Sequence, residues 1–403
     1  MDKKTYIFLT FSVPGIGGTQ IYVRNKLNYL HKRGWNTCAI TTEPGDNIII
    51  KELEPYKDGI FNELVFNPFL FTNRQRNRIL DKVITYIKSF GSLGNTVIIE
   101  SNFIAVAPWG ELLAERLSAK HLIFFIQEDY RFGVDTYRRF FNFKLDRGEL
   151  AANTPKALST LFKGFRDIPP CEKYHLSPYC SNSVEDCESK IEKNLPSADY
   201  YIGSFGRINK PFVLPMVDDL VKYVKKHSDK TFHLVLFGWT DNQAHIQYLK
   251  ETIDPVNNLS FQVTGPIYPI PRRDIKKMDV FISTAGAANS TFNEGQLTIS
   301  IDDTDLRPIG IMGHTTFNSL HRDNEPIVAL EVLLDEIMMQ KKYTSEDKHP
   351  APAEENYTPR FDRQMEFIDR SDSSVKYYPI KRLKPKMLSR IYFGIKYALH
   401  NGK

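Results

Sequence analysis

Strand and helix patterns alternate along this 403-residue chain, and they do so in two separate runs. The first run has strand patterns over 6–11, 37–41, 63–66, 96–101 and 121–127, with helical patterns over 19–32, 73–89 and 108–118. The second has strand patterns over 200–204, 232–237, 259–263, 279–282 and 297–301. Such alternation is typical of a mostly parallel sheet covered by helices on both faces. The sequence therefore predicts an α/β fold with two doubly wound, Rossmann-like domains that face each other across a cleft.

The segment 131–195 breaks this rhythm. It carries Pro155, Pro169, Pro170 and Pro178, and we interpret it as the crossing between the two domains. We expect an N-terminal domain over 1–195, a C-terminal domain over 196–375 and a basic tail over 376–403. The chain is long enough for both domains to bury a core of their own.

Positive charge is concentrated at the C-terminal end. Residues 376–403 contain eight Lys and Arg and no Asp or Glu, so the net charge of +5 belongs to this tail. This argues against a nucleic-acid-binding protein, whose positive charge should cover a folded face. The four cysteines are irregularly spaced, which is typical of a reducing cytoplasm. Since no run of about 18 apolar residues occurs, we expect a cytoplasmic protein that is soluble or peripheral on the inner face of the membrane.

Two loops of small residues follow strands, one in each half. The first is Gly15-Ile16-Gly17-Gly18-Thr19; the second is 283–288, which lies between a buried strand and a helix that ends at Gly295. At such a helix start, free N–H groups and the helix dipole attract an anion, and small side chains let it approach. The pair of loops predicts a site for a nucleotide-activated substrate between the domains.

Four segments carry a resemblance to a known family: GIGGTQIYVRNKLNYLHKRGWNTCAITTEPG, YIGSFGRINKP, HLVLFGWTDNQ and VTGPIYPIPRRDIKKMDVFIST. Together they resemble the GT-B glycosyltransferases, especially the retaining family 4 of bacterial polysaccharide synthesis, over residues 6–43 and 200–302. The resemblance implies transfer of a sugar from a nucleotide donor, with UDP-sugar as the family's usual substrate. It also implies a saccharide acceptor, lipid-linked in surface polysaccharide synthesis, and no metal or other cofactor.

One part of the pattern departs from family 4. Members usually carry two glutamates, eight positions apart, before the strand that follows the donor helix. Neither has a counterpart here, and the loop 284–287 instead resembles GT-B members that bind the diphosphate through a glycine-rich backbone. Glu294, directly before Gly295, is the candidate for the missing ribose contact. Recognition of the sugar and the stereochemical outcome are therefore left open.

The candidate site residues follow from the charge that builds on a departing diphosphate, which cations and aligned N–H groups stabilise. Arg207 and Lys210 stand after the first strand of the second domain, where open α/β sheets bind ligands. The resemblance implies that they are the basic pair that binds the diphosphate, with the catalytic role of stabilising the leaving group. The alternative is a solvated basic turn. The other predicted donor-binding residues are Gly17, Gly18, Ser283, Thr284, Ala285, Gly286, Ala287, Asn289, Ser290, Thr291, Glu294 and His314. For the two glycines the alternative is a tight turn without ligand; for 283–290 it is a structural turn capped by Asn289 or Ser290.

Acid–base candidates are Glu128 and Asp129, which directly follow an apolar strand, so that one of them would act on the acceptor hydroxyl. A helix cap or a salt bridge explains them equally well. Asp302, Asp303 and Asp305 crowd together, but without further ligands at metal-site spacing they are better interpreted as a solvated loop. We predict no metal site.

The tail has two interpretations. Ile391, Tyr392, Ile395 and Leu399 recur at helical spacing, so 381–403 could lie on an anionic membrane or form the helix that in GT-B proteins returns to the first domain. For the whole protein, the alternative to a transferase is a non-catalytic GT-B relative that binds a nucleotide sugar or glycan as an assembly partner. A GT-B sugar epimerase would need carboxylate acid–base residues that the sequence does not place.

Overall fold

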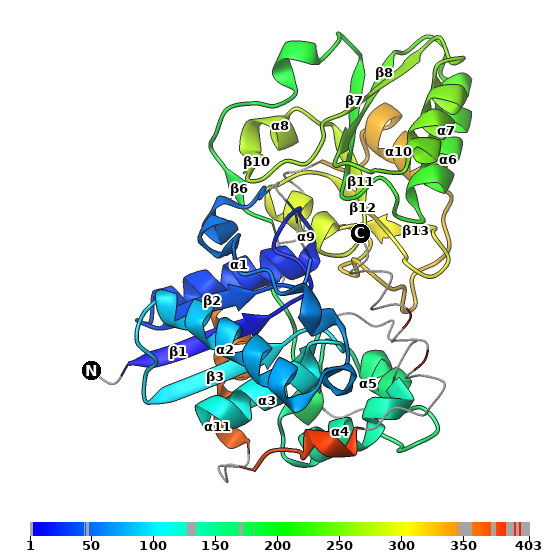
Figure 1. Ribbon diagram of the computed structural model, residues 1–403. Helices are drawn as coiled ribbons and strands as arrows, with labels where there is room; N and C mark the ends of the chain where they lie inside the picture. The colour runs from blue at the N-terminus through cyan, green and yellow to red at the C-terminus, as the bar shows by residue number, and fades with distance from the viewer. Residues whose placement is uncertain are drawn as a thin grey trace. The chain divides into compact units, whose positions relative to one another are not determined.

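The computed structural model (Figure 1) describes residues 3–43, 45, 48–126, 134–168, 172–180, 182–344, 346, 357–371, 376–383, 391 and 395. The chain forms two compact units, one of residues 1–180 with 356–403 and the other of residues 181–355. Each unit is an α/β structure around its own sheet, as the alternating pattern predicts.

The first unit contains a five-stranded parallel sheet in the order β2-β1-β3-β4-β5. Its strands are β1 (Lys4–Leu9), β2 (Asn36–Ile40), β3 (Thr96–Ser101), β4 (Lys120–Phe125) and β5 (Leu150–Ala152). Its helices are α1 (Gly18–His31), α2 (Asn73–Ser89), α3 (Ala107–Leu117), α4 (Val134–Asp146), α5 (Pro155–Phe162) and α11 (Tyr357–Arg370). Side chains alternate across β1: Ile7 and Leu9 pack in the cluster that includes α2 and α3, while Tyr6 faces α1.

The second unit contains a six-stranded sheet in the order β13-β12-β11-β7-β8-β9. Its strands are β7 (Tyr200–Phe205), β8 (Phe232–Phe237), β9 (Leu259–Val263), β11 (Val280–Ser283), β12 (Thr298–Ile301) and β13 (Pro308–Ile311); β13 alone among them is antiparallel to its neighbour. Helices α6 (Val213–Lys226), α7 (Gln243–Ile253) and α10 (Leu330–Leu334) pack on one face, with α8 (Arg272–Lys276) in the cluster of the other. A short parallel pair joins β6 (Val184–Glu185) to β10 (Ile270–Pro271).

The unit boundaries differ from the expected 195/196 and 375/376. Residues 182–195 lie in the second unit because β6 pairs with β10 and Ile191 is buried in the α8 cluster. Helix α11 lies in the first unit because Phe361 packs against Tyr22 and Tyr29 of α1. The predicted crossing segment also contains α4, β5 and α5. Of these, β5 is the edge strand of the first sheet.

The strand predicted over 63–66 is wrong, since Asn62–Val65 forms a 3-10 helix. A run of apolar residues this short does not distinguish a strand from a helical turn by pattern alone. No helix among the described residues is both long and apolar enough to cross a bilayer.

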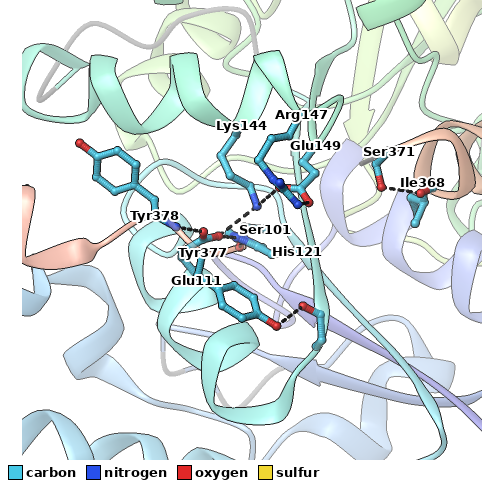
Figure 2. A network of polar contacts seen from close by, with 11 residues as sticks. Ser101, Glu111, His121, Lys144, Arg147, Glu149, Ile368, Ser371, Tyr377 and Tyr378 are labelled. Carbon is cyan, nitrogen blue, oxygen red and sulfur yellow. Dashed lines mark hydrogen bonds and ion pairs between the residues drawn. The ribbon is translucent and has the colours of Figure 1, made fainter. Parts of the chain in front are cut away.

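A buried polar network ties residues 376–383 to the rest of the first unit (Figure 2). Glu111 of α3 accepts hydrogen bonds from the Tyr378 backbone N–H (2.7 Å) and Lys144 Nζ (3.0 Å), and its Oε2 lies 2.7 Å from His121 Nδ1. Burial raises the pKa of Glu111, but Lys144 and His121 more than offset this and hold it at about 2. The carboxylate therefore stays ionised and fixes residues 376–383 against α3.

Candidate nucleotide-binding edge of the second sheet

The strand order of the second sheet defines one point where a ligand is expected. When its six strands are numbered along the chain, the order of this sheet is 6-5-4-1-2-3, so the winding reverses between β7 and β11. Open α/β sheets bind ligands beyond the carboxyl ends of the strands at such a reversal. Arg207 and Lys210 follow β7, while Ser283 ends β11 and Thr284 follows it, so the chain places both candidate segments at the same edge.

Two glycines shape the end of β7. Gly206 has φ +132°, and a Cβ built there would lie 3.3 Å from Lys210 Nζ, so the lysine head group lies against this backbone. Gly238, directly after β8, approaches so closely that its Cβ would lie 1.8 Å from the Gly206 carbonyl oxygen. The Ile208 N–H also donates to the Trp239 carbonyl (3.1 Å), which fixes the loop that carries Arg207.

The two cations differ in their surroundings. Arg207 is exposed, whereas Lys210 is half-buried. Burial and, to a lesser extent, the positive charge of Arg207 lower the pKa of Lys210 to about 8, while Asp303 offsets part of this shift. A lysine at this pKa is largely protonated at neutral pH and gains from any anion placed beside it. Lys210 is thus a cation without full compensation at the ligand edge.

Helix α9 (Ala285–Asn293; Figure 1) begins two residues after the end of β11 and therefore at the same edge. Thr284 occupies the N-cap position without a side-chain cap, and Ala285 has φ +55°. The Ala285 N–H donates to the Ser319 carbonyl, but the N–H groups of Gly286 and Ala287, in the first turn, have no partner within the helix. Ser283 Oγ accepts from the Phe205 N–H at 3.0 Å, which joins the ends of β11 and β7.

The predicted loop over 283–288 is therefore short, because the helix starts at Ala285 and its cap is Thr284. Alanine has the strongest intrinsic preference for helix, so a run of small residues need not be a loop. Asn289, Ser290 and Thr291 lie inside α9 and not in a loop. Ser290 Oγ donates to the Gly286 carbonyl (2.8 Å) and Thr291 Oγ1 to that of Ala288 (3.1 Å), so both hydroxyls bond within the helix.

Other predicted residues lie elsewhere. Glu294 forms an ion pair with Arg272 of α8. His314 follows β13, and because β13 runs antiparallel to β12 it lies at the amino ends of the parallel strands, not at the edge with Arg207. Asp302 accepts backbone N–H groups from Thr304 (2.7 Å) and Arg322 (2.6 Å), as expected of a structural loop.

The first unit repeats part of this arrangement by itself. Gly17 is the extended N-cap residue of α1 (φ −170°), and a Cβ on Gly18 would meet Cys180 at 3.8 Å. In the same helix, Lys26 forms a fully buried ion pair with Glu100 of β3 (2.5 Å). Glu128 and Asp129 lie outside the described residues, as does most of 381–403.

Sequence reasoning interpreted Asp303, whose charge acts on Lys210, only as part of a solvated loop, and it missed Trp239, whose carbonyl fixes the Arg207 loop. Both are the second residue after the end of a strand, β12 for Asp303 and β8 for Trp239, and that position was the available signal. Within the part of the chain that the structure describes, no three His, Cys, Asp or Glu side chains gather as metal ligands would.

Gly238→Ala is expected to lower the free energy of unfolding by about 3 kcal/mol, because its new methyl group would meet backbone that cannot rotate away. Thermal unfolding measures this directly. Gly18→Ala is the matched control: its methyl group would meet Cys180 at an ordinary 3.8 Å. Equal melting temperatures for the two variants would contradict the tight packing of the β7 and β8 ends.

Comparison with known proteins shows which solved structures share this fold. No family model and no curated protein sequence matches the chain. Among solved structures, a glycosyltransferase from Rickettsia africae ESF-5 matches with a TM-score of 0.58 at 16% identity, covering 93% of this chain and 100% of its own. Anabaena HepE in complex with UDP-glucose matches with a TM-score of 0.52 at 13% identity, covering 99% of both chains.

An epimerase shares the architecture. The UDP-GlcNAc 2-epimerase from Neisseria meningitidis bound to UDP-GlcNAc matches with a TM-score of 0.50 at 11% identity, covering 91% of this chain and 100% of its own. Identities this low establish the fold alone. The chain therefore has the fold of GT-B glycosyltransferases and UDP-GlcNAc 2-epimerases, with two Rossmann-like units, and membership of family 4 stays a prediction.

Proposed function

We propose that this protein is a glycosyltransferase that moves a sugar from a nucleotide diphosphate donor to a saccharide acceptor without a metal ion. The observation that carries the proposal is the pair Arg207 and Lys210 beside the start of α9, at the reversal point of the second sheet. Neighbours of the same fold are described with UDP, UDP-glucose or UDP-GlcNAc bound, which supports a uridine diphosphate donor.

Arg207, Lys210 and the start of α9 stabilise the leaving group, which is the nucleoside diphosphate. When the bond from the sugar to the diphosphate breaks, negative charge grows on the phosphate oxygens, and preorganised cations and N–H dipoles stabilise that charge most where water is excluded. Arg207 supplies a permanent charge and Lys210 a half-buried one, while the N–H groups of Gly286 and Ala287 add the helix dipole. Asp303 balances part of the positive charge before the donor binds.

The acceptor is proposed from the family resemblance alone: a lipid-linked saccharide in surface polysaccharide synthesis at the cytoplasmic face of the membrane. Since Glu294 is paired with Arg272 in this structure, we do not assign the ribose contact to it. Recognition of the donor sugar then falls to residues beyond the two cations.

A second candidate is an epimerase of the same fold, which the match to the Neisseria enzyme favours. Epimerisation needs a carboxylate that removes or returns a proton at the sugar ring. Asp303 is a carboxylate at this edge of the sheet, but its charge acts on Lys210, so the transferase is the better-supported function.

Incubation of the full-length protein with a panel of UDP-, GDP- and dTDP-sugars separates these functions by product. NMR and mass spectrometry are expected to show UDP release and, with a matching saccharide, a larger glycan. An epimerised nucleotide sugar would replace the transferase by the epimerase, and binding with no turnover of any donor would favour the non-catalytic partner.

The pKa of Lys210 predicts how UDP affinity depends on pH. Since the group titrates near pH 8, its positive charge is present below that pH and is lost above it. The dissociation constant of UDP should therefore begin to rise near pH 8 and approach a tenfold increase per pH unit. Lys210→Arg keeps the charge at all these pH values and should remove most of the slope; a slope equal to that of the wild type would contradict this role.

A further inference from the structure

The chain returns to the carboxyl edge of the second sheet after β13. There the Ser319 carbonyl accepts the Ala285 N–H at the start of α9, and the Leu320 carbonyl accepts the Asp303 N–H (3.0 Å) just beyond the end of β12. Both hydrogen bonds lie where β11 and β12 end, and both join residues of the second unit. We define residues 318–322 as the edge segment. It borders the proposed site for the diphosphate.

Two carboxylates hold the edge segment in place. Glu325 accepts hydrogen bonds from Asn318 Nδ2 (2.7 Å) and Thr316 Oγ1, and Asp302 accepts the Arg322 N–H (2.6 Å). Burial raises the pKa of Glu325, but hydrogen bonds, of which that from Thr316 is the largest contribution, more than offset this and hold it at about 2. The Glu325 carboxylate therefore stays ionised near neutral pH and anchors the segment.

His321 is the exposed residue of the edge segment, and the rest of the segment is half-buried. The backbone on either side of it is bonded, since Leu320 accepts from Asp303 and Arg322 donates to Asp302. Within the described residues, the imidazole itself forms no hydrogen bond or ion pair. A fixed backbone thus holds an unpaired imidazole at the edge where the ligand is expected.

Asp303 connects His321 to the cations of the site. The charge of Asp303 acts on Lys210, so these two side chains lie near each other although Lys210 follows β7 and Asp303 follows β12. The ends of β7 and β12 are two strands apart, which is about 10 Å at about 5 Å per strand. A diphosphate held by Lys210 and the start of α9 therefore has β12 and His321 on one side and β8 on the other.

β8 and β12 offer different chemistry to the two ends of a nucleotide sugar. Trp239, the second residue after β8, is a half-buried aromatic whose Nε1 is buried and has no hydrogen-bond partner in the described part of the chain. A flat aromatic ring suits the base, which can stack on it. The edge segment beside β12 instead carries the polar side chain of His321 and suits the sugar.

We infer that His321 recognises the sugar of the nucleotide-sugar donor through hydrogen bonds to its hydroxyl groups. A hydroxyl both donates and accepts, and an imidazole in its neutral form has one N–H donor and one acceptor nitrogen. Phosphate oxygens only accept, and the site already holds Arg207, Lys210 and the first N–H groups of α9 for them. The inference rests on the proposed function and assigns the sugar end of the donor to one side chain.

Calorimetric titration of the full-length protein with UDP, UDP-glucose, UDP-galactose and UDP-GlcNAc tests this role. The wild type is expected to bind UDP and at least one of the three UDP-sugars. His321→Ala should raise the dissociation constant of that UDP-sugar about five- to tenfold, the effect of one lost hydrogen bond. It should leave the dissociation constant of UDP within about twofold, because UDP carries no sugar beyond its second phosphate.

His321→Gln keeps a donor and an acceptor and should recover most of the lost affinity. Asn324→Ala is the matched control, because Asn324 is an exposed polar residue close by in the chain that also forms no hydrogen bond or ion pair within the described residues. It should leave every dissociation constant within about twofold of the wild type. All three variants should keep the wild-type melting temperature, since none of them loses a contact.

An equal loss of affinity for UDP and for the UDP-sugar in His321→Ala would mean that the residue contacts the diphosphate or the base, and would overturn the inference. Unchanged affinity for every UDP-sugar would also overturn it, as would a wild type that binds UDP and none of the UDP-sugars. A wild type that binds none of the four ligands would contradict the proposed function, and the inference with it.

Discussion

Replacing Arg207 by alanine is expected to weaken UDP binding by about 10- to 100-fold, the range for loss of a hydrogen bond to a charged group. The rate of sugar transfer should fall further, by about 10² to 10³, because the charge on the diphosphate is largest in the transition state. Arg207 is exposed in the free protein, so the structure predicts little change in stability. Calorimetry measures the affinity for UDP, and a rate assay at saturating donor measures the rate of sugar transfer.

The control for this variant is Arg273→Ala, which removes an exposed arginine of α8 in the same unit. It should leave both the affinity for UDP and the transfer rate within about twofold of the wild type. If Arg207→Ala and Arg273→Ala behave alike, Arg207 belongs to a solvated basic turn and not to the site.

Breaking the buried ion pair of the first unit should produce the largest loss of stability. Lys26 Nζ and Glu100 Oε2 lie 2.5 Å apart with neither side chain exposed. Tyr6 Oη (2.5 Å), Tyr22 Oη (2.9 Å) and Asn102 Nδ2 (2.7 Å) also donate to this carboxylate. Burial lowers the pKa of Lys26, and Glu100 offsets part of this shift because it favours the charged lysine.

Lys26→Met should therefore lower the free energy of unfolding by about 3–5 kcal/mol, since it leaves the Glu100 charge buried without its cation. The double variant Lys26→Met, Glu100→Leu should recover most of this loss, because it removes both charges. Denaturant unfolding measures both. A double variant less stable than Lys26→Met would show that the hydrogen bonds of Glu100 matter more than its charge balance.

The sequence predicted the α/β architecture well because apolar periodicity reports which residues are buried. Helix α2 and strands β8 and β9 have the predicted bounds. In α2 the buried residues recur at helical spacing, and β8 is a mostly apolar run that is buried throughout. β5 was missed: its three residues, Leu150–Ala152, are too few to show a period. The prolines of this segment also favoured its interpretation as a crossing between the domains.

The candidate site was predicted in part. The position of Arg207 and Lys210 after β7 follows from the predicted end of that strand in the sequence. The strand order, which brings β11 beside β7, comes from the structure. The place of His314 also comes from the structure, because it depends on β13 reversing direction, and nothing in the residues 308–311 distinguishes an antiparallel edge strand from a parallel one. Lys26 was also missed. A lysine between the buried residues Val23 and Leu27 was a signal for a buried partner.

Calorimetric titration of the wild-type protein with UDP and with uridine tests the central claim most directly, because the two ligands differ by the diphosphate alone. Binding through Arg207, Lys210 and the start of α9 predicts that UDP binds at least about 100-fold more tightly than uridine. It also predicts that most of this difference disappears in Arg207→Ala. UDP that fails to bind, or that binds no more tightly than uridine, would contradict the account.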